Sequence, residues 1–400
     1  MEGDLMVDLG VEFLGVEFKS PILLSSAPPT LDADHIKRAV EAGFGGGVTK
    51  TISYRQFHDP KPRFQGVKVR NRLFGMQNIE HISTYVFDWW KKEFKVLREL
   101  KKTHGTPIVA SIMASTDLDE WAKLAKDVEA EGADIIELNV SCPHMSDSAM
   151  GAYIGQDCPL TSEVSKAAAE AVSIPIMTKL TPNVTDIASI AKEAIKGGAK
   201  GVSAINTVLV LSGVDINTGN PLPDVWGKGG FGGYSGPAVR PIGLRMVGEI
   251  AREGINVSGI GGIDTWENVI EYMMMGAGTV QLATAAMWYG FDIVKGWNEN
   301  ILTFMKEHGY DSLADLKGVT LPKITDLEKL DYVDEVYSDV DTERCIDCRR
   351  CVTACRDGAT DAMKNPKLND VDTEKCVGCA LCKMVCPQNC ISMIIKKDKK

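Results

Sequence analysis

The sequence predicts an α/β protein: a (β/α)8 barrel followed by a small, cysteine-rich α+β domain. Two observations lead to this prediction. Short apolar runs alternate with segments of helical period over the first 330 residues, and all of the eleven cysteines except Cys142 and Cys158 lie between Cys345 and Cys390. Alternating strands and helices indicate βαβ units and a parallel sheet. Eight such units within about 300 residues favour a closed barrel over an open sheet.

The predicted strands are short apolar runs, and amphipathic segments lie between most of them. Several of these segments end in glycine, as helices often do. We predict strands over 21–28, 46–52, 107–113, 134–140, 175–180, 201–207, 256–260 and 279–284. We predict helices within 33–43, 117–133, 161–172, 185–199, 240–254 and 265–278.

Length and composition indicate two globular domains. A chain of 400 residues exceeds the usual span of one domain. We predict a barrel over 1–330, a linker over 331–340, a second domain over 341–392 and a charged tail over 393–400. The net charge of −10 argues against nucleic acid or an anionic membrane surface as a partner. No signal peptide or membrane span is evident, so we expect a cytoplasmic protein, in which cysteines bind metals or react more often than they form disulfides.

Polar and small residues gather where the predicted strands end, which is where barrel enzymes place their active sites. The loops after the last two strands of such barrels commonly hold a phosphate by backbone N–H groups, and here "GIGGID" and "LATAAM" supply small residues that permit a close approach. The residues at these strand ends are Ser25, Ser26, Ala27, Thr49, Lys50, Asn139, Cys142, Lys179, Asn206, Thr207, Gly261, Gly262, Ala283 and Thr284.

The cysteine array has the spacing of a bacterial ferredoxin, written twice. Two [4Fe–4S] clusters need eight thiolates, and the fourth cysteine of each run ligates the other cluster. We therefore assign one cluster to Cys345, Cys348, Cys351 and Cys386, and the other to Cys376, Cys379, Cys382 and Cys355. Two zinc sites of four cysteines each are the alternative, although zinc sites usually pair separate C-x2-C elements. Cys390 has no place in this scheme.

Clusters pass single electrons, so the barrel should hold a group that also performs two-electron chemistry. A flavin meets both demands. No G-x-G-x-x-G motif follows a predicted strand, so this chain has no evident nicotinamide- or FAD-binding domain. A reducing nucleotide would then bind a partner protein.

Five motifs in order resemble a known family: "ELNVSCPH", "KLTPNVTD", "INT", "GGYSGPAVRPIGLR" and "GIGGIDTWE". They resemble the FMN barrel of dihydropyrimidine dehydrogenase and, more distantly, of dihydroorotate dehydrogenase. The resemblance covers residues 8–320, and the ferredoxin module continues it to 392. It is strongest to the bacterial two-subunit form of the enzyme. It implies FMN, two [4Fe–4S] clusters, a partner subunit that binds NAD(H) and FAD, and a homodimer within a heterotetramer.

The resemblance also implies roles for individual residues. Cys142 matches the acid/base cysteine, with Ser141 as second choice for proton relay, and Asn78 and Glu80 match substrate-binding residues. The implied reaction is reversible reduction of the C5=C6 bond of uracil or thymine, with hydride from flavin N5 to C6 and a proton from Cys142 to C5. Further pyrimidine contacts are Asn139, Asn206 and Thr207. Flavin contacts are Ser25, Ser26, Ala27, Thr49, Lys50, Asn139, Lys179, Asn206, Gly236, Gly261, Gly262, Ala283 and Thr284, of which Lys179 also counts as catalytic.

Three alternatives stay open at this stage. The substrate could be dihydroorotate, although Glu80 is an unfavourable neighbour for a carboxylate, or another cyclic amide or enone. The protein could also be a non-catalytic electron-transfer subunit. The partner and the physiological direction are not encoded in any motif.

Cys142 opens a predicted loop of about twenty residues, and loops of that length are often lids.

Overall fold

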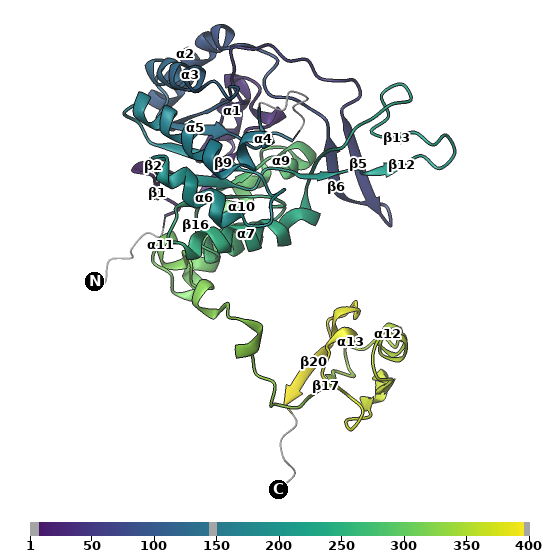
Figure 1. Ribbon diagram of the computed structural model, residues 1–400. Coiled ribbons are helices and arrows are strands. Elements are labelled where there is room, and N and C mark those ends of the chain that lie inside the picture. The colour runs from purple at the N-terminus through teal and green to yellow at the C-terminus, as the bar shows by residue number, and fades with distance from the viewer. Residues whose placement is uncertain (1–7, 144–149, 396–400) are drawn as a thin grey trace, which may run out of the picture. The chain divides into compact units, whose positions relative to one another are not determined.

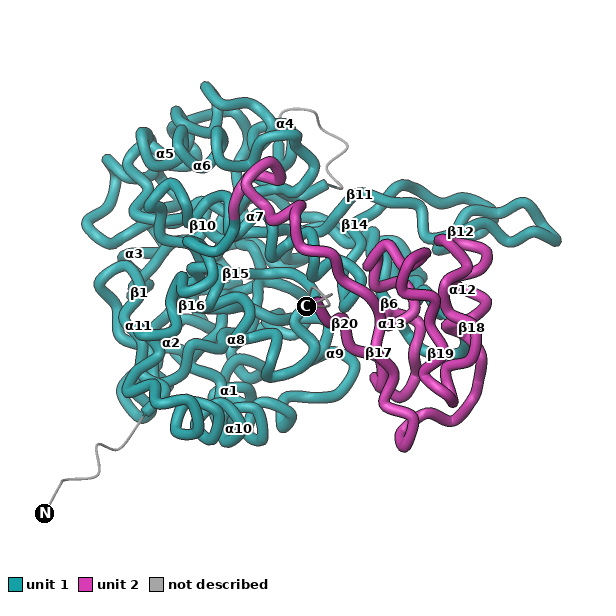
Figure 2. The backbone as a smooth tube through the Cα atoms, turned by 90° about the horizontal axis from the view of Figure 1, so that it is seen from below, with its two compact units in different colours: residues 1–324 teal, residues 325–400 magenta. Residues whose placement is uncertain are grey.

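The computed structural model describes residues 8–143 and 150–395 of the chain. The chain divides into two compact units, residues 1–324 and 325–400 (Figure 2). Among the described residues, no helix is both long and apolar enough to cross a membrane.

The first unit is built on a closed barrel of eight parallel strands, and the predicted (β/α)8 fold is confirmed (Figure 1). Each barrel strand falls within or overlaps one of the eight predicted runs. Round the barrel, the strands are β10 (Gly201–Ala204), β15 (Val257–Ile260), β16 (Ala277–Leu282), β3 (Ile22–Leu24), β4 (Gly46–Val48), β7 (Ile108–Ile112), β8 (Ile135–Asn139) and β9 (Ile176–Leu180).

Helices surround this barrel (Figure 1). Four of them begin after an aspartate whose side chain accepts a backbone N–H of the first turn, at Asp32, Asp117, Asp157 and Asp186. The helices are α1 (Ala33–Glu41), α2 (Phe87–His104), α3 (Leu118–Ala130), α4 (Ala152–Gly155), α5 (Cys158–Ala171), α6 (Ile187–Lys196), α7 (Arg240–Arg252), α8 (Trp266–Met274), α9 (Thr284–Tyr289), α10 (Ile293–His308) and α11 (Leu313–Leu316). Two long ones, α2 and α10, lie outside the predicted helical segments.

The inside of the barrel changes character along its axis. At the amino ends of the strands, an antiparallel hairpin of β1 (Val11–Phe13) and β2 (Val16–Phe18) packs Phe13 and Phe18 into an apolar cluster. Its other buried members are Leu23, Val48, Val109, Ile135 and Met177. Further along the strands the buried side chains are polar, including Ser111, Glu137, Ser203, Ser258 and Gln281. One end is therefore a closed apolar floor, and polar groups occupy the path towards the other end.

A second sheet extends from the barrel and was not predicted (Figure 1). Its strand order is β11-β14-β6-β5, all antiparallel. It is formed by two insertions, β5 (Phe64–Val69) with β6 (Arg72–Asn78), and β11 (Val208–Val210) with β14 (Gly232–Ser235). The second insertion also carries the short hairpin of β12 (Gly213–Val214) and β13 (Pro221–Leu222).

The second unit is small and α+β. Strand β17 (Val336–Val340) pairs antiparallel with β20 (Ile391–Ile395). Half of the predicted linker over 331–340 and the start of the predicted tail over 393–400 therefore belong to one sheet of this unit. Between these strands lie α12 (Arg350–Gly358), β18 (Met363–Asn365), β19 (Asp370–Val371) and α13 (Leu381–Met384).

Candidate functional site

Two adjoining cavities open where the barrel strands end. The first is bordered by the ends of β3, β10, β15 and β16 and by β6 and β14 of the second sheet. Most of the predicted cofactor residues line it. They are Ser25, Ser26, Ala27, Lys179, Asn206, Gly236, Gly261, Gly262, Ala283 and Thr284, together with the predicted substrate residues Asn78, Glu80 and Thr207.

The second cavity contains Cys142, whose side chain is 7% exposed. It shares part of its wall with the first cavity, so the two form a continuous pair. The shared residues are Ser26, Ala27, Pro28, Asn78, Glu80, Lys179, Asn206 and Thr207, and Lys50 and Asn139 are added in the second. The structure thus gathers around one space side chains that are more than 120 positions apart in the sequence, as Asn78 and Asn206 show.

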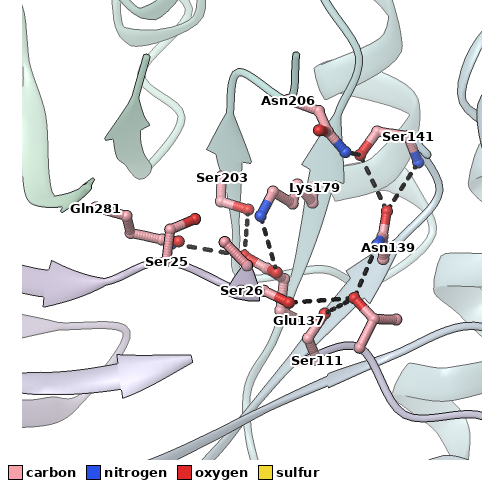
Figure 3. Close-up of polar contacts among 12 residues, drawn as sticks. Ser25, Ser26, Ser111, Glu137, Asn139, Ser141, Lys179, Ser203, Asn206 and Gln281 are labelled. Atoms are coloured by element: carbon pink, nitrogen blue, oxygen red, sulfur yellow. Dashed lines mark hydrogen bonds and ion pairs between the residues drawn. The ribbon is translucent and has the colours of Figure 1, made fainter. Parts of the chain in front are cut away.

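Lys179 lies between the two cavities and contacts a buried carboxylate (Figure 3). Its Nζ lies 3.4 Å from Oε1 of Glu137, a residue with no exposed surface. The other carboxylate oxygen, Oε2, accepts a hydrogen bond from Ser203 Oγ at 2.8 Å and one from Gln281 Nε2 at 3.5 Å. Charge and hydrogen bonds together hold the ammonium group at the cavity wall.

Asn139, Ser141 and Asn206 form a second polar chain (Figure 3). Asn139 Nδ2 donates to Thr51 Oγ1 at 2.9 Å, and Asn139 Oδ1 accepts from both the backbone N–H and the hydroxyl of Ser141. Asn206 Nδ2 donates to Ser141 Oγ at 2.8 Å. Ser141 is fully buried behind the two asparagines and lines neither cavity. It fixes how both amides face the cavities.

Thr49 also lies behind the cavity wall. It is fully buried, and its hydroxyl accepts the backbone N–H of Ser111 at 3.0 Å. Neither cavity is lined by Thr49. Just past the end of β4, Lys50 reaches the second cavity while Thr49 supports the barrel.

Glu80 is buried between two cations. Its Oε1 accepts from Arg63 Nε at 2.7 Å, and its Oε2 lies 3.6 Å from Lys50 Nζ. Nearby, burial opposes ionisation of Asp59, but hydrogen bonds from His81 and the charges of Lys50 and Arg63 lower the pKa of Asp59 below its usual value. Arg63 was not predicted, because it immediately precedes β5 of the inserted sheet and does not follow a barrel strand.

Three glycines shape the far wall of the first cavity. Gly236, Gly261 and Gly262 all have positive φ, at 96°, 123° and 70°. A Cβ at Gly262 would lie 2.5 Å from the backbone nitrogen of Arg240, where α7 begins. Tyr272 donates its hydroxyl to the carbonyl oxygen of Gly261 at 2.6 Å. This part of the wall carries no side chains, which suits close approach by a ligand.

Two further polar residues line the first cavity and were not predicted. Gln281 Oε1 and Asp264 Oδ1 are both buried, and neither oxygen has a hydrogen-bond partner. Burial raises the pKa of Asp264.

Glu137 carried the clearest signal available in the sequence, since it is a charged residue inside an apolar strand. Much of the predicted lid after Cys142 falls on 144–149, outside the described residues, and helices α4 and α5 occupy most of its second half.

Thiols of the second unit surround a small cavity. Its lining includes Cys345, Cys348, Cys351 and Cys386, the four assigned to one cluster, and also Cys390. Cys390 Sγ lies 3.4 Å from Cys386 Sγ. The thiols surround the space rather than converge: among the described residues, no group of three candidate ligands could hold a single metal ion. An arrangement around a space suits a cluster, in which each iron takes its own thiolate.

Three of the four thiols assigned to the other cluster belong to one apolar core, and the fourth, Cys379, is exposed. Cys355 and Cys382 are buried in it, and Cys376 packs against it. Burial raises the pKa of Cys382, and the neighbouring thiols Cys355 and Cys376 add to that rise. The sulfur of Cys355 accepts backbone N–H groups from Ala362 at 3.2 Å and Met363 at 3.4 Å. Such N–H donors stabilise a ligand sulfur that carries negative charge.

Comparison with known proteins gives two family matches. Residues 8–305 match the family described as dihydroorotate dehydrogenase. Residues 338–393 match the family described as a 4Fe-4S dicluster domain. The two matches together span both units of the structure.

Curated relatives share about a third of their residues with this chain. It is 36% identical over 366 residues to the NAD-dependent dihydropyrimidine dehydrogenase subunit PreA of Escherichia coli, covering 90% of this chain and 88% of the relative. It is 35% identical to the chloroplastic dihydropyrimidine dehydrogenase (NADP(+)) of Arabidopsis thaliana, covering 80% and 78%. It is 36% identical to the catalytic subunit of dihydroorotate dehydrogenase B (NAD(+)) of Pyrococcus abyssi, covering 78% and 99%.

A solved structure shares the barrel fold. The ligand-free type DHODH from Eimeria tenella superposes with a TM-score of 0.65 at 19% identity, covering 80% of this chain and 94% of that chain. At this identity the likeness shows the fold alone.

Proposed function

The chain belongs to the dihydroorotate dehydrogenase family and is an oxidoreductase, and from this premise we propose that it reduces the C5=C6 double bond of uracil or thymine, reversibly. The observation that carries this proposal is the pair of adjoining cavities. A glycine-walled cavity adjoins a second one that is lined by Cys142 and three asparagines, Asn78, Asn139 and Asn206. The first suits a flavin, and the second suits a small ring with alternating N–H and C=O groups.

The residues of the first cavity fit FMN. Gly236, Gly261 and Gly262 line this cavity with backbone at positive φ, and backbone N–H groups can bind a phosphate. Lys179 is a buried cation at the wall, and Gln281 offers an unpartnered acceptor oxygen. When bound there, FMN would supply hydride to the pyrimidine. A cation near the ring favours the negative charge of its reduced form.

Residues of the second cavity would bind the pyrimidine and move its proton. Asparagine side chains offer both donors and acceptors, and Glu80 offers acceptors alone, so together they can match an edge of alternating polarity. Cys142 would give its thiol proton to C5 and take it back in the reverse direction. Ser141 supports the two asparagines from behind, so we assign it a positioning role in place of direct proton relay.

Electrons would enter through the second unit. Its thiol-lined cavity and its match to a 4Fe-4S dicluster domain support two [4Fe–4S] clusters with the assigned ligands. The relative PreA is named as an NAD-dependent subunit, which supports a separate partner carrying NAD(H) and FAD. We propose a homodimer within a heterotetramer with that partner, located in the cytoplasm, where these thiols stay reduced.

Anaerobic titration of the purified protein tests this function. Dihydrouracil or dihydrothymine should bleach the flavin absorption, and dihydroorotate should not. Bleaching by dihydroorotate alone would instead identify a dihydroorotate dehydrogenase, as the relative from Pyrococcus abyssi is named. A protein purified with no flavin would contradict the proposal at its first step.

A cysteine pair provides the matched variants. Cys142→Ala should abolish pyrimidine turnover while FMN and iron content stay at wild-type levels. Cys158→Ala is the control, because Cys158 begins α5 and lines neither cavity. Wild-type turnover in the Cys142→Ala variant would refute the assignment of the proton donor.

A further inference from the structure

The proposed chemistry uses Lys179 but leaves unexplained why a carboxylate is buried beside it. In the described part of the chain, the buried carboxylates are Glu80 and Glu137. Glu80 lines both cavities, whereas Glu137 lines neither. Burying a carboxylate is costly unless a cation and hydrogen bonds compensate. Glu137 therefore has a role that it exerts through its neighbours.

The partners of Glu137 point to that role (Figure 3). Lys179 Nζ, at 3.4 Å, is the charged partner, and Ser203 Oγ and Gln281 Nε2 are neutral donors. A charge this close and this buried is weakly screened by solvent. Glu137 therefore offsets part of the positive charge that Lys179 presents at the cavity wall, and it fixes where the ammonium group lies.

Glu137 also orients Gln281. A carboxylate accepts hydrogen bonds but donates none, so the amide nitrogen of Gln281 must face it. Gln281 Nε2 is held from a second side by Ser258 Oγ at 3.1 Å. The amide oxygen is thereby turned away from Glu137 and is left without a partner in a residue that lines the first cavity. One carboxylate thus governs both the charge and the acceptor at this wall.

We propose that Glu137 is a positioning residue that sets the redox potential of the flavin by balancing Lys179 and orienting Gln281. This inference rests on the proposed function, because it requires FMN in the first cavity. With Glu137 neutral, the uncompensated ammonium would favour the anionic reduced flavin more strongly. The potential would then rise, and removal of Lys179 would lower it.

Flavin potentials and sulfite affinities test the proposal on the full-length, cluster-loaded protein. Sulfite adds to flavin N5 and reports the positive charge around the ring. Glu137→Gln should raise the flavin midpoint potential and tighten sulfite binding about tenfold or more, as expected for one nearby charge. Lys179→Met should shift both in the opposite direction. In the double variant, which has lost both charges, the potential and the sulfite affinity should lie between those of the two single variants.

Glu120→Gln is the matched control. Glu120 is also a largely buried carboxylate paired with a cation, Arg55, at 3.6 Å, but it lines neither cavity. Its substitution should leave the potential and the sulfite affinity unchanged. If Glu137→Gln fails to retain FMN, the double variant should regain it, because removing both charges leaves no unpaired ion.

Three results would overturn the proposal. One is a Glu137→Gln protein that holds FMN and has the wild-type potential and sulfite affinity. Another is a double variant whose potential lies outside the range set by the two single variants. The third is a double variant that fails to regain FMN lost by Glu137→Gln. The proposed function has its own, separate failure, since a purified protein without flavin would refute it before any potential is measured.

Discussion

Gly262→Ala is expected to disrupt the first cavity far more than a substitution of another glycine that has nearly the same positive φ. Gly262 has φ +70°, a region in which an L-residue costs about 1–2 kcal/mol. Its new Cβ would also lie 2.5 Å from the backbone nitrogen of Arg240 and 2.8 Å from its Cα. Neither atom is the flexible end of a side chain, so the start of α7 or the 261–262 turn must move.

Gly254→Ala isolates the effect of this clash. Gly254 has φ +73°, and a Cβ there would meet nothing within 4 Å. Both variants share the conformational cost, and overpacking should add about 1–3 kcal/mol to Gly262→Ala alone. Because Gly262 lines the first cavity, we expect FMN affinity to fall at least about tenfold, which corresponds to about 1.4 kcal/mol.

Two measurements on this pair decide the outcome. Chemical denaturation gives the loss in free energy of unfolding, and fluorescence titration of the flavin-free protein with FMN gives the affinity. Gly254→Ala should lose stability but keep wild-type FMN affinity. Equal losses of stability in both variants, with unchanged FMN affinity in Gly262→Ala, would refute both the clash and the assignment of this wall to the phosphate.

Three further predictions concern groups around the cavities. Tyr272→Phe removes the hydrogen bond to the Gly261 carbonyl, so the free energy of unfolding should fall by about 1 kcal/mol in denaturant titration, and an unchanged value would contradict that bond. Burial raises the pKa of Asp264 above 3.8, so its carboxyl favours the folded state while protonated and that contribution is lost as pH rises through the raised pKa. As the pH rises above 3.8, the melting temperature of the wild type should therefore fall relative to that of Asp264→Asn. A difference in melting temperature that does not change with pH would exclude this effect. Arg63→Met leaves Glu80 with Lys50 as its remaining cation, so KM for the pyrimidine should rise at least about tenfold while FMN content stays constant; a changed kcat with unchanged KM would argue against a binding role.

The barrel could be predicted because its signals are local. Each strand is a short apolar run between helical segments, and the rule that parallel strands end at one rim places Lys50, Asn139, Lys179 and Asn206 together without any knowledge of distance. The same rule does not distinguish a side chain at the rim from one just behind it. For this reason the sequence predicted Thr49 as a flavin contact, although its hydroxyl supports the barrel wall.

The second sheet could not be predicted from its sequence. Its strands alternate poorly and are exposed on part of their surface, so they resemble loops when taken alone. The sheet exists because β6 pairs with β14, more than 150 residues later in the chain. That pairing brings Asn78 into the first cavity, whereas the neighbouring β5–β6 pairing places Arg63 against Glu80.

The sequence by itself determined the alternating barrel, the thiol spacing of the cysteine array and the position of Cys142 after a buried strand. Each of these depends on neighbours along the chain, and within each cysteine run the ligands are only a few residues apart. Only the tertiary structure decided which charges meet: Glu137 with Lys179, and Glu80 with Arg63 and Lys50. Those contacts join residues on different strands and loops, and a buried charge requires its partner within a few ångströms, a distance that only the closed barrel and its attached sheet define.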